Sequence, residues 1–142
     1  MVNIKSILFS IYNITCVCLT FLIGKFNLQL VILITIMIID YILGIILAVI
    51  FHKSPKSETG RLESKAGFKG IIRKAAYFVV VIIANFTDLI SGNSFIRDCV
   101  IVCLIINEIL SIIENLGLMG VPIPKVLINA IDILKRKSED ND

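Results

Sequence analysis

Asp40 is the only charged residue in an apolar segment that spans residues 28–51. An ionised carboxylate at the centre of a membrane span costs about 2.5 kcal/mol or more, so it pairs, becomes protonated or lines an ion path. Gly44 and Ala48 follow at four-residue steps and form a small-residue helix face that another helix can approach closely. Two roles stay open for Asp40: a group on a proton or ion path, or a protonated or hydrogen-bonded residue in a packing and oligomerisation face.

A second set of polar residues lies in the apolar segments nearer the C-terminus. The candidates for a polar or pore-facing surface are Asn85, Asp88, Asn107, Glu108, Ser111 and Glu114. Most of the last four residues of this list lie on one side of a helix. The polar groups of such a stripe find hydrogen-bond partners either between packed helices or in the water of an assembled pore. Only Asp40 and Glu108 lie deep enough to need partners, and no Lys or Arg is expected at the depth of Asp40. Arg97 is either an interfacial anchor or a partner of Asp88.

The sequence offers no support for catalytic or metal-binding chemistry. The single histidine, His52, has no Ser or Cys partner in a recognisable motif, and no phosphate-binding or dinucleotide-binding fingerprint occurs. The cysteines occur as Cys16-x-Cys18 and Cys99-x-x-x-Cys103 inside apolar segments, where thiols usually behave as small hydrophobes. We therefore expect no enzyme, no cofactor and no metal site.

Long apolar blocks make up most of the 142 residues, of which 57% are hydrophobic, and the mean hydropathy is +0.95. Soluble domains contain about 45–50% apolar residues, so this composition indicates a membrane protein. Four blocks approach or exceed the length that crosses a bilayer, at about residues 7–23, 28–51, 75–90 and 95–113. We predict one all-α integral membrane domain over residues 1–142. The first block also has features of a signal peptide, but we favour a retained helix; with three spans the N-terminus would lie outside.

Basic residues concentrate between the second and third blocks, in a loop predicted over residues 52–74. Those nearest its end are Lys65, Lys69, Arg73 and Lys74. By the positive-inside rule this loop is cytoplasmic, which places both termini of a four-span chain inside. Residues 124–137 repeat with a helical period and are too short to span, so they are expected to form an amphipathic helix on the membrane or on a partner. The net charge is only +3 and Trp is absent, so nucleic acid is not an expected partner.

The order of the motifs resembles the toxin-secretion and phage-lysis holin family, the TcdE-like holins. The resemblance extends over about residues 30–135 and rests on an ordered set of weak motifs. They are Ile39-Asp40-Tyr41-Ile42-Leu43-Gly44, then 67–74 (GFKGIIRK), 84–88 (ANFTD), 107–115 (NEILSIIEN) and 120–124 (GVPIP). The family has no catalytic residues to carry over.

The resemblance implies a protein that oligomerises in the bacterial cytoplasmic membrane and forms lesions through which an endolysin or a large toxin leaves the cell. Its partners would be membrane lipid, further copies of the chain, an antiholin and the exported cargo. Two alternatives stay open. One is an antiholin that joins holin oligomers and blocks opening, and the other is a small ion- or proton-coupled transporter or channel.

Overall fold

The computed structural model describes residues 4–55, 64–129 and 133, and within them every regular element is helical. The elements are α1 (Ile4–Ile23), α2 (Leu28–Ile46), the π-helical turn η1 (Leu47–Phe51), α3 (Ser64–Ser91) and α4 (Phe95–Leu118). A shorter helical stretch follows Pro124, over Lys125–Asn129. The all-α prediction is confirmed.

Among the residues that the structure describes, four helical segments are long and apolar enough to cross a membrane: Ile4–Ile23, Leu28–Phe51, Gly67–Ser91 and Phe95–Leu118. A helix pairs its own backbone N–H and C=O groups, which is necessary in a membrane because hydrocarbon offers them no hydrogen-bond partners. Most large apolar side chains on these helices point outward, as a lipid solvent requires. The chain is therefore a multi-pass membrane protein.

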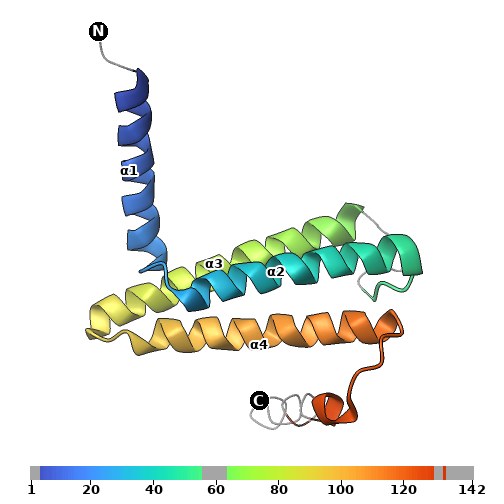
Figure 1. The fold of residues 1–142 in the computed structure, drawn as a ribbon. Coiled ribbons are helices and arrows are strands. Elements are labelled where there is room, and N and C mark those ends of the chain that lie inside the picture. The colour runs from blue at the N-terminus through green and yellow to red at the C-terminus, as the bar shows by residue number, and fades with distance from the viewer. Residues whose placement is uncertain (1–3, 56–63, 130–132, 134–142) are drawn as a thin grey trace.

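Helices α2, α3 and α4 lie side by side along their lengths, whereas α1 projects away from this bundle (Figure 1). One end of the bundle carries the connection from α1 to α2 at Gly24 and the tight turn from α3 to α4 at Gly92. We call this the turn end. Both glycines have a positive φ, 83° and 67°, which residues other than glycine rarely adopt.

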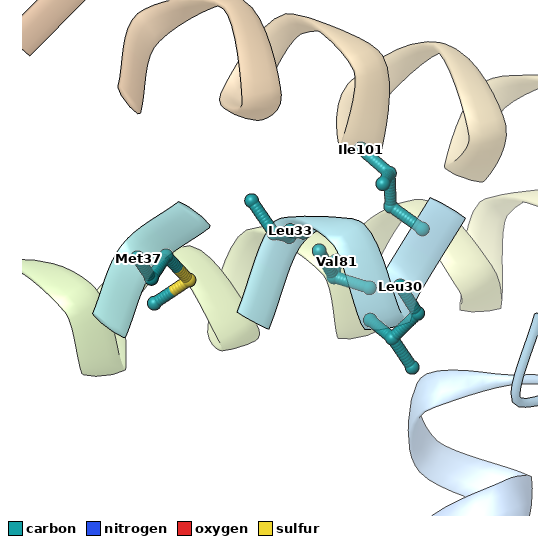
Figure 2. Close-up of a cluster of buried hydrophobic side chains, with 5 residues drawn as sticks. All are labelled: Leu30, Leu33, Met37, Val81 and Ile101. Atoms are coloured by element: carbon teal, nitrogen blue, oxygen red, sulfur yellow. The ribbon is translucent and has the colours of Figure 1, made fainter. Parts of the chain in front are cut away.

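The apolar core lies where the three bundle helices meet (Figure 2). Its buried members are Leu30, Leu33, Met37, Val81 and Ile101, which come from α2, α3 and α4. The three residues from α2 recur at steps of three and four, so they share one helix face. This face continues into Asp40, so the polar site begins where the apolar core ends.

The second half of the predicted loop is helical. α3 begins at Ser64, so it contains Lys65, Lys69, Arg73 and Lys74, and the prediction of a loop that ends at residue 74 is wrong for these four residues. Lys65, Lys69 and Arg73 are exposed, and a helix needs no apolar residues to continue beyond the hydrocarbon. α4 likewise continues past residue 113 to Leu118, and the predicted end of the tail helix at residue 137 lies outside the described residues.

Candidate functional site

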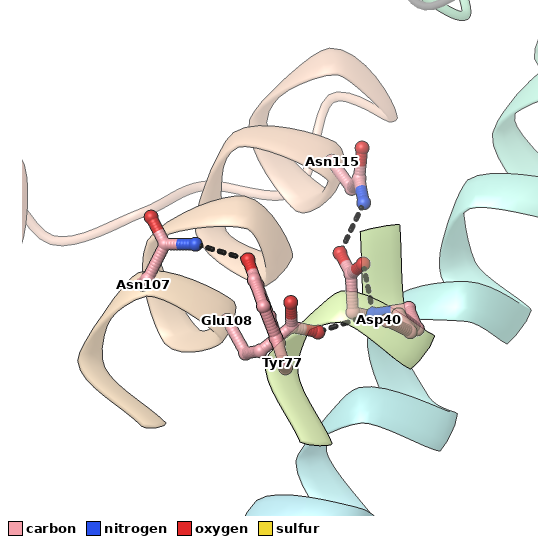
Figure 3. A network of polar contacts seen from close by, with 6 residues as sticks. Asp40, Tyr77, Asn107, Glu108 and Asn115 are labelled. Atoms are coloured by element: carbon pink, nitrogen blue, oxygen red, sulfur yellow. Dashed lines mark hydrogen bonds and ion pairs between the residues drawn. The ribbon is translucent and has the colours of Figure 1, made fainter. Parts of the chain in front are cut away.

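A buried ionic network joins the three bundle helices (Figure 3). The Lys74 ammonium from α3 donates to Asp40 Oδ2 of α2, at 3.0 Å, and to Glu108 Oε2 of α4. One cation thus lies between two carboxylates that approach it from different helices. Charge-assisted bonds of this kind are stronger than bonds between neutral groups, so this lysine ties all three helices together.

Amide and phenol groups extend the network on either side. Asn115 of α4 donates to Asp40 Oδ1 at 3.1 Å, so both oxygens of this carboxylate accept a hydrogen bond. Nearby, Asn107 Nδ2 donates to Tyr77 Oη at 2.6 Å, linking α4 to α3 at the bundle surface. The Asp40 and Glu108 side chains are only 4% and 5% exposed, which removes them from lipid.

The network lies near the middle of the spans. Asp40 is twelve residues from the start of α2 at Leu28, and Glu108 is thirteen from the start of α4 at Phe95, which corresponds to about 18–20 Å from the turn end. Moving ions to this depth is costly unless they are paired and hydrogen-bonded. With both carboxylates ionised, the Asp40, Lys74 and Glu108 set would carry one net negative charge.

The structure corrects the expectation that Asp40 has no basic residue at its depth. Lys74 was assigned to the cytoplasmic loop because its charge appeared to precede the span that starts at residue 75. It occupies instead the first position of a helical repeat that continues through Tyr77, Val81 and Asp88 on the inward face of α3. That repeat was the sequence signal that could have identified it.

A second polar cluster fastens α1 to the bundle at the turn end. Asn85 of α3 donates to the carbonyl oxygens of Phe21 and Leu22, both at 3.0 Å, near the C-terminus of α1. Arg97 of α4 donates to the carbonyl of Lys25 at 2.7 Å. Carbonyls at the end of a helix lack partners within the helix, so these side chains satisfy them.

Gly24 is packed tightly inside this cluster. A Cβ atom added to it would lie 2.6 Å from Asn85 Oδ1 and 2.8 Å from Arg97 Nη1. Its φ of 83° already disfavours any other residue. The junction of α1 and α2 therefore favours glycine for its backbone conformation, and a larger residue there would also have to displace the ends of the Asn85 and Arg97 side chains.

Asp88 caps the N-terminus of α4. Its Oδ1 accepts from the Ile96 amide at 3.0 Å, and its Oδ2 accepts from the Arg97 amide at 2.9 Å. A carboxylate at a helix N-terminus satisfies otherwise unpaired amides and interacts favourably with the helix dipole. Arg97 was expected to be either an interfacial anchor or a partner of Asp88. In the structure its backbone amide donates to Asp88, whereas its guanidinium donates to the carbonyl of Lys25.

Replacing Asp88 with alanine is expected to cost about 2–3 kcal/mol, because two charge-assisted bonds at a buried helix start are lost. Thermal stability of the purified protein in mild detergent measures the change. Asp98→Asn is the matched control, since Asp98 lies in the first turn of α4 without these two bonds, and its effect should stay below about 1 kcal/mol. Equal losses in the two variants would contradict the capping role.

The other candidate residues lie outside the ionic network. Ala48 is buried in η1, whereas a Cβ added to Gly44 of α2 would meet nothing within 4 Å. Ser111 is half-buried and Glu114 exposed, so the polar side of α4 that faces the bundle carries Glu108 and Asn115 instead. Lys65, Lys69 and Arg73 are exposed. Within the described residues no group of His, Cys, Asp or Glu could hold a metal ion.

Comparison with known proteins gives a consistent result. The model of the bacteriophage holin family matches residues 17–136. A probable holin of Bacillus phage phi105 is 37% identical over 106 residues, which cover 74% of this chain and 70% of that protein. Uncharacterized proteins of Halalkalibacterium halodurans and Listeria innocua are 39% and 38% identical, over 82% and 86% of this chain and 84% and 82% of theirs. No solved structure matches.

Proposed function

Because the chain belongs to the bacteriophage holin family, we propose that it oligomerises in the cytoplasmic membrane and forms lesions that release a cytoplasmic endolysin or a large toxin. In this role the chain accumulates as a closed bundle and then opens. Both termini and the α2–α3 connection are cytoplasmic, as the basic residues of that region predict.

The observation that carries the proposal is the placement of polar groups inside the bundle. Asp40, Lys74, Glu108 and Asn115 are satisfied by one another, while the outward surface of the same helices is apolar. Such a protomer is stable in lipid and conducts nothing. A water-filled lesion needs a polar lining, and these side chains could supply it once the three helices separate.

Inducible expression of the chain alone in a bacterium tests the proposal. Membrane potential and release of a co-expressed cytoplasmic endolysin are followed on the same time axis, with the endolysin expressed alone as control. Lesion formation predicts abrupt depolarisation together with endolysin escape. Continued growth with the chain verified in the membrane would overturn the proposal and favour an antiholin.

The transporter alternative makes a different prediction for Asp40→Asn. A coupling carboxylate would be essential, so proton flux would be abolished, whereas a lesion former should still release endolysin because asparagine preserves the packing. Measuring both signals in the variant separates the two functions. Loss of proton flux in a chain that never releases endolysin would favour transport.

Replacing Gly44 with leucine is expected to reduce oligomer formation without unfolding the protomer. The open space beside Gly44 leaves room for a side chain, and leucine favours a helix over glycine by about 0.8 kcal/mol. Cross-linked ladders in isolated membranes measure the oligomers. Gly67→Leu, at an equally open helical position of α3, is the control. An unchanged ladder in the Gly44 variant would exclude this face from assembly.

A further inference from the structure

We propose that α1 of one copy packs lengthwise into the groove between α3 and α4 of a neighbouring copy, with Asn13 of α1 bonded to Asn107 of the neighbour. The proposal names the contact surfaces of the oligomer and therefore rests on the proposed function. It follows from two uncovered surfaces that match in polarity and in depth.

The first surface is α1 itself. None of its residues is buried, and Asn13 lies exposed near its middle with no hydrogen-bond partner among the described residues. Thr15, by contrast, is already satisfied by the carbonyl of Ile11 at 2.9 Å. A side-chain amide in hydrocarbon lacks water to bond to, so a partner helix with polar groups at the same depth stabilises it.

The second surface is an apolar groove of about 410 Å³ on the bundle. Its wall from α3 includes Val80, and its wall from α4 includes Ile96, Cys99, Val100 and Cys103. The steps of three and four along α4 lead from Ile96 through Cys99 and Cys103 to Asn107, one turn further. The groove thus runs from the turn end towards the pair formed by Asn107 and Tyr77.

This pair has hydrogen-bonding capacity left. Asn107 uses one amide hydrogen on Tyr77 Oη, which leaves its carbonyl oxygen and its second amide hydrogen for a partner. A carboxamide both donates and accepts, so Asn13 can bond reciprocally with these groups. The two surfaces are therefore complementary in polar groups as well as in apolar ones.

The depths of the two surfaces also agree once α1, which projects away from its own bundle (Figure 1), turns to run along α3 and α4 of the neighbour. Asn13 is ten residues from the end of α1 at Ile23, about 15 Å, and Asn107 is twelve residues from the start of α4 at Phe95, about 18 Å. Cys16 and Cys103 lie at seven and eight residues, about 10 and 12 Å. The difference is within one helical turn in both pairs.

A second copy fits this groove better than the α1 of the same chain. Asn85 holds the C-terminal end of α1, and α1 leaves the bundle on the side away from α4 (Figure 1). Each copy consequently offers one helix and one groove, which are different surfaces. Such a heterologous contact adds copies in series and closes into a ring where the rotation permits.

Co-expression of two differently tagged variants tests the contact. One variant retains only Cys16 and Cys18 (Cys99→Ser, Cys103→Ser), and the other retains only Cys99 and Cys103 (Cys16→Ser, Cys18→Ser). Thiol oxidation in isolated membranes should produce a band that carries both tags, whereas each variant alone should give little dimer. The native chain, which has both surfaces, should give a ladder beyond the dimer.

Asn13→Leu and Asn107→Leu are expected to lower the yield of the two-tag band about three- to tenfold, in line with hydrogen bonds between membrane helices. Thr15→Val should leave it unchanged, because Thr15 is satisfied within its own helix. Absence of the two-tag band, with both variants in the membrane, would overturn the proposal, as would an equal dimer yield from the Cys16 and Cys18 variant alone. Endolysin release scored in parallel separates the outcomes: release without the band removes this contact, whereas the band without release removes the lesion function.

Discussion

Replacing Lys74 with methionine should destabilise the folded protein by about 3–5 kcal/mol, because it leaves Asp40 and Glu108 buried without their shared cation. Methionine is an unbranched side chain only one atom shorter than lysine, so the loss of charge dominates the effect. The midpoint temperature for loss of monodisperse protein in mild detergent should fall by about 10 °C or more. In cells the variant should accumulate poorly or release endolysin at a changed time.

Companion variants separate the charge from the side chain itself. Asp40→Asn or Glu108→Gln alone leaves Lys74 with one carboxylate, so each should cost far less than Lys74→Met. The triple neutral variant Asp40→Asn, Lys74→Met, Glu108→Gln should recover most of the stability, because no buried charge remains. Lys69→Met, at an exposed position of the same helix, is the surface control. A triple variant as unstable as Lys74→Met would refute the ionic explanation.

Gly24→Ala should be the second most damaging substitution, although it adds one methyl group. The added Cβ would lie under 3 Å from the side chains of Asn85 and Arg97, and it would force a residue with a side chain into a left-handed conformation. Conformational strain alone costs about 1–3 kcal/mol, and displacement of two buried polar groups adds to it. We expect a fall in thermal stability and increased protease cleavage at the junction of α1 and α2.

Gly92→Ala supplies the matched comparison for this prediction. Gly92 has a similar φ of 67°, but a Cβ there would meet nothing within 4 Å. Gly92→Ala should therefore show the stability lost to the left-handed backbone conformation without any steric clash. The excess loss in Gly24→Ala over Gly92→Ala measures how firmly the turn-end cluster holds α1. Equal losses would mean that Asn85 and Arg97 move aside without cost.

The spans were predictable because the bilayer constrains them so strongly. Apolar blocks of sufficient length identify α1, α2 and α4 to within a few residues. The start of α3 at Ser64 was missed because hydropathy reports where hydrocarbon ends rather than where a helix ends. The direction in which α1 leaves the bundle could not be predicted from the sequence either. It depends on Asn85 and Arg97, which follow α1 by more than sixty residues.

The residues of the polar site could be predicted better than the bonds between them. Asp40 and Glu108 were identified as needing partners because of their depth, and Asp88 and Asn85 as polar residues near a span end. The pairings join residues 34 and 75 positions apart, as in Lys74 with Asp40 and Asn115 with Asp40. Which faces of three helices meet is a tertiary property, so a single sequence does not specify these bonds.

The separation between Asp40 and Lys74 also affects biosynthesis. α2 leaves the ribosome before its counter-ion, which is made 34 residues later, or about 2–7 seconds at ordinary translation rates. During that interval the translocon holds a span whose carboxylate has no basic partner, and Glu108 arrives only after a similar delay. The Asp40 carboxylate therefore gains its basic partner only when α3 has been made, and the network is complete only when α4 supplies Glu108 and Asn115.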